Sequence, residues 1–413
     1  MLAPGQMLPL VIEKPAVGGR MIARVDGQIV LVAGAIPGER VQARIERVGK
    51  GVGYAETVTV DDPSGDRRPP FTDLVCGGSL YAHIAYPRQR AIKAQVIADA
   101  FARIARLQLP GEVGVAASPE EGYRMRARLH VRGRRVGFFR EGTHDVCDAR
   151  DTRQLLPATC DVVDRLSAAL RSVGAEAIRE IELSENVDAS QRAVHFDTAD
   201  RIDSRIVGRL ASIDGITRGP HVTDTLRFGG TTVTLRRHVQ AFFQGNRYLL
   251  EDLVAHVVNH VPTGGALADL YAGVGLFAVA AAATRGASVV AVEGDPFAAD
   301  DLRANAAAAG GQIVAKKGAV EEFLSGAMSA PGMPDAKAGV VIVDPPRTGL
   351  SREALTAVVE FAAPRLIYVS CDVATLARDA RRIVDSGYAL HRADAFDLFP
   401  NTPHVETVVV FER

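Results

Sequence analysis

Short apolar runs alternate with segments of helical periodicity along the C-terminal part of the chain. The expected strands lie at 266–271, 288–293, 339–343 and 365–369. The expected helices follow them at 275–285, 296–309, 351–361 and 373–386. A closing hairpin pairs 388–396 with 405–412. Because alternating strands and helices build a parallel sheet covered on both faces, this pattern predicts a Rossmann-like α/β domain over 226–413.

The first 60 residues have a different pattern. Short β-branched runs at 28–32, 40–45 and 56–60 are separated by glycine and proline turns. Frequent turns between strands of this length favour a small, OB-like β-barrel, which we place at 1–62. Residues 61–70 have the composition of a linker.

The region between, 71–225, is predicted to be an α+β domain. It opens with helical periodicity over 85–107 and continues into a strand in which basic residues recur with a period of two. These residues are Arg124, Arg126, Arg128, Arg132 and Arg134, with His130 filling the gap. They leave one face of the strand, opposite an apolar face that includes Met125 and Leu129. A solvated face is one interpretation, but so uniform a sign favours binding of an RNA phosphate backbone.

The composition describes an ordinary globular chain. Hydrophobic residues make up 47% and charged residues 23% of its 413 residues, and the net charge is −1. No apolar stretch reaches the roughly 18 residues that span a bilayer. Four cysteines over this length do not make a disulfide framework. We therefore expect a cytoplasmic protein, without a membrane partner, that acts as a monomer.

The ends of the first two strands carry residues typical of a ligand site. The first strand runs into a turn containing Gly273 and Gly275, and the second ends at Glu293 about twenty residues on. An acid there accepts hydrogen bonds from ribose hydroxyls. The third glycine of a pyrophosphate-binding turn is replaced by Ala278, which favours S-adenosylmethionine over a dinucleotide. A tight turn with a solvated Glu is the structural alternative.

Cys371 follows the fourth strand and is the candidate nucleophile. A thiolate that adds to carbon 6 of a pyrimidine makes carbon 5 electron-rich, so that carbon 5 can accept a methyl group. A base must then remove the carbon-5 proton. Glu406 interrupts an apolar strand, where a carboxylate is costly without a task, and it is the candidate base. In Asp344-Pro345-Pro346-Arg347, the arginine stands where amino-group methylases carry a base-stacking aromatic, which argues against an exocyclic-amine target.

The motifs together resemble the RNA 5-methyluridine methyltransferases over nearly the whole chain. The N-terminal part resembles the TRAM-type barrel of that family through Gly18-Gly19 and 37–41. The resembling catalytic motifs are Phe243-Gln244-Gly245-Asn246, Asp344-Pro345-Pro346-Arg347, Ser370-Cys371-Asp372 and 403–407. The resemblance implies a class I S-adenosylmethionine-dependent enzyme that flips a uridine out of its RNA, with Cys371 as nucleophile and Glu406 as base. It also implies cofactor contacts from Gln244, Tyr271, Glu293 and Asp344.

One departure from the family concerns an iron–sulfur cluster. Many members hold a cluster with four cysteines, but here only Cys76 matches. The other three positions are taken by Pro70, Ser79 and Thr152. Cys147 and Cys160 are off register, and a cluster needs several thiolates, so we expect no cluster and no other metal.

Three hypotheses remain open at this stage. The favoured one is methylation of carbon 5 of a uridine in ribosomal or transfer RNA. The same thiol chemistry fits carbon 5 of cytosine. A third possibility is an RNA-binding or chaperone protein with a vestigial catalytic domain, although the intact Cys371, Glu406 and glycine turn count against it.

Overall fold

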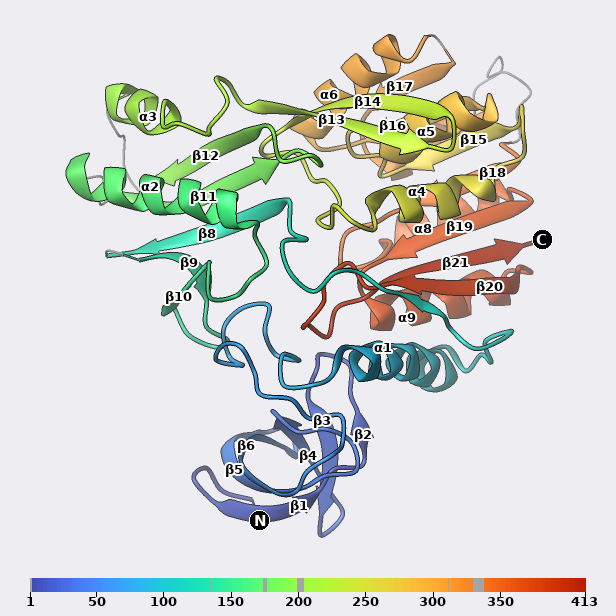
Figure 1. The fold of residues 1–413 in the computed structure, drawn as a ribbon. Helices are drawn as coiled ribbons and strands as arrows, with labels where there is room; N and C mark the ends of the chain where they lie inside the picture. The colour runs from blue at the N-terminus through green and yellow to red at the C-terminus, as the bar shows by residue number, and fades with distance from the viewer. Residues whose placement is uncertain (1, 134, 174–176, 199–203, 311, 330–337) are drawn as a thin grey trace.

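The computed structural model describes residues 2–413 except 134, 174–176, 199–203, 311 and 330–337. Figure 1 shows an N-terminal barrel at one end, an antiparallel sheet with helices on one side, and a larger α/β layer structure that carries the C-terminus. The fold class predicted from the sequence is confirmed. Among the described residues, no helix has both the length and the apolar character needed to cross a bilayer.

The barrel is a six-stranded sheet with the order β1-β5-β6-β4-β3-β2. Its strands are β1 (Met7–Val11), β2 (Lys14–Pro15), β3 (Met21–Val25), β4 (Gln28–Ala33), β5 (Arg40–Gly49) and β6 (Val52–Asp62). Alternate residues of each strand point inward, so that Val41, Ala43 and Ile45 of β5 are buried together. The period-two pattern of the sequence thus produces a core of its own for this small domain.

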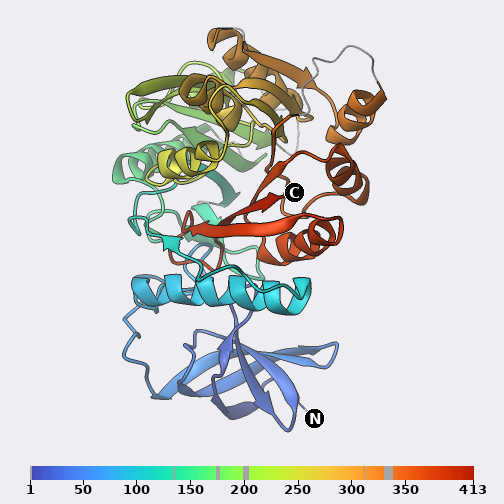
Figure 2. The ribbon, with the colours of Figure 1, turned by 90° about the vertical axis from the view of Figure 1, so that its right-hand side faces the viewer.

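Helix α1 (Tyr86–Ala100) lies between the barrel and the α/β part (Figures 1 and 2). Its residue Ile92 belongs to the barrel core, whereas Ile97 belongs to one of the cores of the α/β part. The helix continues into a π-helical turn, η1 (Phe101–Ala105), and the following strand β7 (Val115–Ala116) pairs with the edge of the large sheet. The region 71–225, which the sequence assigns to the central domain, therefore includes α1 and β7, which pack on the barrel and on the α/β part.

The central domain contains a five-stranded sheet with the order β10-β9-β8-β11-β12. Its elements are β8 (Arg126–Arg132), β9 (Arg135–Phe139), β10 (Val146–Asp148), α2 (Pro157–Val173), β11 (Ile178–Glu185), β12 (Arg192–Thr198) and α3 (Ser204–Ala211). As predicted, Met125 and Leu129 are fully buried. The opposite face is less uniformly positive than expected, because β11 supplies acids: Arg128 pairs with Glu182 at 2.8 Å.

The C-terminal part is built on an eight-stranded sheet with the order β17-β16-β15-β18-β19-β21-β20-β7. The strands are β15 (Ala266–Leu270), β16 (Ser288–Glu293), β17 (Ile313–Lys317), β18 (Val340–Val343), β19 (Arg365–Ser370), β20 (Ala389–Phe396) and β21 (Glu406–Glu412). The helices are α4 (Leu250–Asn259), α5 (Leu276–Arg285), α6 (Pro296–Ala308), α7 (Val320–Ser329), α8 (Arg352–Phe361) and α9 (Val373–Asp385). A hairpin of β13 (His221–Phe228) and β14 (Thr231–His238) precedes them.

Burial explains why the central strands of the large sheet could be predicted from the sequence. β15, β18 and β19 are parallel neighbours covered by helices on both faces, and every residue of β18 is buried. Strands of this kind appear as continuous apolar runs. The closing hairpin is also as predicted, with β21 inserted antiparallel between β19 and β20. The carboxyl ends of β15, β16, β18 and β19 meet at one edge of the sheet.

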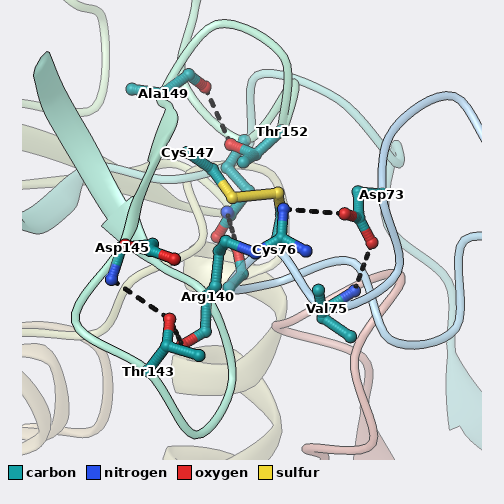
Figure 3. Close-up of a disulfide and its surroundings, with 11 residues drawn as sticks. Asp73, Val75, Cys76, Arg140, Thr143, Asp145, Cys147, Ala149 and Thr152 are labelled. Atoms are coloured by element: carbon teal, nitrogen blue, oxygen red, sulfur yellow. Dashed lines mark hydrogen bonds and ion pairs between the residues drawn. A yellow bond between two sulfur atoms is a disulfide. The ribbon is translucent and has the colours of Figure 1, made fainter. Parts of the chain in front are cut away.

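A disulfide joins Cys76 of the barrel-to-α1 connection to Cys147 of β10 (Figure 3). The sequence analysis did not anticipate this pair. The connection is also held by main-chain bonds, since Gly77 N donates to the Phe139 carbonyl and Glu141 N donates to the Val75 carbonyl. Thr152, near the disulfide, is buried and donates to the Ala149 carbonyl (Figure 3). The disulfide therefore fastens the connection to the central sheet.

Reducing this disulfide is expected to lower the free energy of unfolding by about 2–4 kcal/mol, because the bond closes a long loop in the unfolded chain. Chemical denaturation with and without a dithiol measures the change. A variant with both Cys76→Ala and Cys147→Ala serves as the control, and its stability should not respond to the dithiol. Equal stability of the oxidised and reduced wild-type protein would contradict the prediction.

Candidate functional site

A cavity of about 850 Å³ opens at the carboxyl edge of the large sheet and extends to the central domain. We call it the carboxyl-edge cavity. Ten of the residues selected from the sequence line it: Arg124, Arg126, Arg128, Gln244, Tyr271, Gly273, Glu293, Asp344, Cys371 and Glu406. Gly275 and Arg132 do not line it, and Arg134 lies outside the described residues. The parallel topology thus gathers side chains that are far apart in the sequence.

The two glycines of the turn after β15 have different tasks. A Cβ atom on Gly273 would meet no atom closer than 4.0 Å, so this residue leaves open space beside the cavity. A Cβ atom on Gly275 would lie 2.8 Å from Leu302 Cδ1 on α6. Gly275 is therefore needed for packing against α6, and its contact with the cofactor stays a prediction. Tyr271, with a φ of 61°, begins the turn in the left-handed region.

Glu293 ends β16 and its carboxylate is fixed by main-chain donors. Gly273 N donates to Oε2 at 2.7 Å, and Asp295 N donates to Oε1 at 2.6 Å. A carboxylate oxygen has more than one lone pair, so each still has capacity to accept from a ligand hydroxyl. The open space at Gly273 next to this anchored acid fits the ribose of an adenosyl group. The residues present therefore fit S-adenosylmethionine.

Asp344 lies at the end of β18, where the two following prolines restrict the loop. Gln244 Nε2 donates to its Oδ2 at 3.1 Å. Burial raises the pKa of Asp344 to about 7, Gln244 opposes that rise, and the negative charge of Glu293 adds to it. Asp344 therefore changes charge near neutral pH inside the carboxyl-edge cavity.

Cys371 directly follows β19 and precedes α9, whose N-cap is Asp372. The thiol is half-buried and opens into the cavity. The pKa of the Cys371 thiol is raised to about 12, mainly by burial and also by the carboxyl of Glu406, whereas Arg347 beside the sulfur opposes the rise. In the free protein the thiol is therefore protonated, and Arg347 is the group that favours the thiolate.

Glu406 is the first residue of β21 and is only 3% exposed. Burial raises its pKa well above the usual value, Asp344 raises it further, and Arg347 lowers it. One guanidinium thus faces both the thiol and this carboxyl. A buried acid with a raised pKa beside a candidate nucleophile is typical of a group that exchanges a proton during catalysis.

The lining residues that were not among the candidates selected from sequence include Phe242, Arg347 and Phe399. Phe242 is 61% exposed, and the guanidinium of Arg126 lies 5.9 Å from its ring centroid. A large exposed aromatic next to arginines is a signal for a base-stacking surface. For Arg347, the signal was its place in the Asp-Pro-Pro-Arg motif. No local pattern marks Phe399.

The architecture and the cavity define the class of protein as a class I methyltransferase joined to an N-terminal barrel. Comparison with family models matches residues 163–413 to the tRNA (uracil-5-)-methyltransferase family and residues 2–58 to the TRAM domain. The chain therefore belongs to the tRNA (uracil-5-)-methyltransferase family, and it is an RNA uracil-C5 methyltransferase that uses S-adenosylmethionine.

Relatives match along almost the whole chain. The 23S rRNA (uracil(1939)-C(5))-methyltransferase RlmD of Halomonas elongata is 34% identical, over 98% of this chain and 89% of the relative. The RlmD of Pseudomonas fluorescens is 30% identical over 99% and 94%. Among solved structures, the tRNA (uracil-54, C5)-methyltransferase of Pyrococcus abyssi, in complex with S-adenosyl-L-homocysteine, shares the fold with a TM-score of 0.76. It is 23% identical and covers 98% of this chain and 99% of that one.

The titration of Asp344 predicts a pH dependence of cofactor affinity. Its pKa is raised to about 7, so below that pH the carboxyl is protonated and offers no negative charge to a sulfonium or ammonium group. The dissociation constant for S-adenosylmethionine should therefore increase as the pH falls below about 7, by up to about tenfold per pH unit. Calorimetry across this range measures it. The Asp344→Asn variant should bind S-adenosylmethionine weakly at every pH in this range. If its affinity depended on pH as in the wild type, another group would be responsible for the titration.

Proposed function

We propose that this protein methylates carbon 5 of a uridine in structured RNA through a covalent bond between Cys371 and the uracil ring. The single observation that carries the proposal is the cavity itself: Cys371, Glu406 and the Gly273 turn line the same carboxyl-edge cavity. A nucleophile, a base and a fitting place for the methyl donor then meet around one substrate ring.

Cys371 begins the reaction. Its thiolate adds to carbon 6 of the uracil, which forms a carbon–sulfur bond and leaves an enolate whose carbon 5 is nucleophilic. Arg347 supports this step because its positive charge lowers the pKa of the thiol. When bound, S-adenosylmethionine supplies an electrophilic methyl group to carbon 5. Glu406 then takes the proton from carbon 5, the carbon–sulfur bond breaks, and the electron pair returns to Cys371.

The RNA would approach from the side of the central domain. Arg124, Arg126 and Arg128 line the cavity, and Arg124 donates to the side-chain oxygen of Gln154 rather than to an acid. Phosphates are the natural partners of arginine side chains in such a position. Arg132 and Arg134 complete the proposed RNA-binding set. A base must leave its stack to reach Cys371, and Phe242 offers it an exposed ring.

The relatives favour a ribosomal substrate, since the RlmD proteins of Halomonas elongata and Pseudomonas fluorescens are both named for a uridine of 23S rRNA. Mass spectrometry of nucleosides from 23S rRNA and from tRNA, in cells with and without the gene, tests this. We expect 5-methyluridine to be lost from 23S rRNA alone. Loss of 5-methylcytidine would support the cytosine alternative, and no change in either RNA would support the vestigial one.

We further propose that the protein acts in the cytoplasm as a monomer and without an iron–sulfur cluster. In support, the one cysteine that matches a cluster position, Cys76, is bonded to Cys147. The described residues also contain no group of three or more metal-ligating side chains. Iron analysis of anaerobically purified protein tests the absence of a cluster, and sedimentation at several concentrations tests the monomeric state.

A further inference from the structure

The loop between β20 and β21, residues 397–405, presents Phe399 to the carboxyl-edge cavity and leads directly into Glu406. Connecting loops usually lie on the surface and move. Much of this one is buried: Asp397, Asn401 and Thr402 are at most 5% exposed. We call it the base loop. Several of the groups that hold it come from the N-terminal third of the chain, and Asn246 also donates to the Leu398 carbonyl at 3.1 Å.

Two side chains of α1 hold the base loop. Lys93 Nζ donates to Asp397 Oδ1 at 2.5 Å and to the Phe399 carbonyl at 3.1 Å, and this ion pair is fully buried. Gln89 forms a reciprocal pair with Asn401: its Nε2 donates to Asn401 Oδ1, and its Oε1 accepts from Asn401 N, both at 2.9 Å. Since the Phe399 carbonyl is one of the bonded atoms, α1 directly fixes the main chain of a cavity residue.

The barrel touches the same loop. Gly19, with a φ of 92°, sits so close that a Cβ atom there would lie 2.7 Å from Pro403 Cγ and 2.8 Å from Leu80 Cδ2. Its neighbour Gly18 has a φ of 89° and meets nothing within 4 Å. Because α1 also contributes Ile92 to the barrel core, the barrel reaches the base loop both directly and through α1.

We propose that Gln89, Lys93 and the Gly19 contact are positioning elements for methyl transfer, which hold Phe399 and Glu406 toward the Cys371 thiol. The inference rests on the proposed roles of Cys371 and Glu406. It makes the N-terminal barrel a structural support of the catalytic centre in addition to any contact it makes with RNA. The step most sensitive to a displaced loop is removal of the carbon-5 proton, because Glu406 follows the loop directly.

The glycine pair offers a matched test. Gly18→Ala and Gly19→Ala introduce the same side chain at nearly the same φ, but only the second pushes against Pro403. We expect kcat of Gly19→Ala to fall by about tenfold to 100-fold, since small displacements of catalytic groups act on that scale, and Gly18→Ala to stay near wild type. We also expect the Gly19 variant to accumulate protein–RNA adduct during turnover, with unchanged KM for S-adenosylmethionine.

A second pair lies on α1. Gln89→Ala removes the bonds to Asn401, whereas Gln95→Ala changes an exposed residue of the same helix and is the control. Equal kcat and equal adduct levels within both pairs of variants would overturn the inference. A fall in kcat that is accompanied by weaker cofactor binding or by a lower melting temperature would also overturn it. If the wild-type protein formed no 5-methyluridine, the proposed function would fail instead, so the two failures are distinguishable.

Discussion

Replacing Cys371 by Ala is expected to lower turnover by more than about 10⁴-fold, the scale on which loss of a covalent nucleophile acts. Without the sulfur, no bond to carbon 6 forms and carbon 5 stays a poor nucleophile. Incorporation of labelled methyl groups into RNA measures the effect. Binding of S-adenosylmethionine should be retained, because its proposed contacts lie at Glu293, Asp344 and the Gly273 turn.

Cys160 provides the control for this experiment. It is the other free cysteine among the described residues, and it is buried in the core of the central domain, away from the carboxyl-edge cavity. Cys160→Ala should keep nearly full activity at a temperature where it is folded. Near-normal methylation by Cys371→Ala would remove the nucleophile assignment and, with it, the covalent mechanism.

The parts of the fold that could be read from the sequence are those in which burial imposes a pattern. The fully buried β18 and β19 appear as apolar runs that end in polar motifs. The edge strand β17 was missed because four of its five residues are intermediate or exposed, and its sequence ends in two lysines. Helix α7 beside it was missed with it. Strand β7, with two residues, is too short to leave any periodic signal.

The candidate site divides in the same way. Residues at the carboxyl ends of the parallel strands were found because sheet topology alone brings them together. Gly273 and Gly275 could not be told apart, since spacing does not reveal which glycine borders open space and which packs against a helix. Phe399 was missed because its place depends on Lys93 and Asp397, which are 304 positions apart. The pairing of β8, which carries the arginines, with the acidic strand β11 likewise depends on residues far apart in the sequence.

Glu406→Gln is expected to trap the covalent intermediate. The amide cannot take the carbon-5 proton, so the carbon–sulfur bond to Cys371 persists after the methyl group has been transferred. Turnover should fall by about 10²–10⁴-fold, the usual contribution of a general base. A denaturing gel should show a stable protein–RNA band, and mass spectrometry of the digested band should find a methylated uracil on the Cys371 peptide.

Glu412→Gln is the matched control, because it makes the same change at the partly exposed end of the same strand, where Glu412 pairs with Arg365. It should form no stable adduct. Burial raises the pKa of Glu406, and a base acts only when deprotonated, so decay of the wild-type adduct should speed up as the pH rises. Decay of the adduct in the Glu406→Gln variant should not depend on pH in this way. An adduct that resolves in this variant as fast as in the wild type would place the base elsewhere in the cavity.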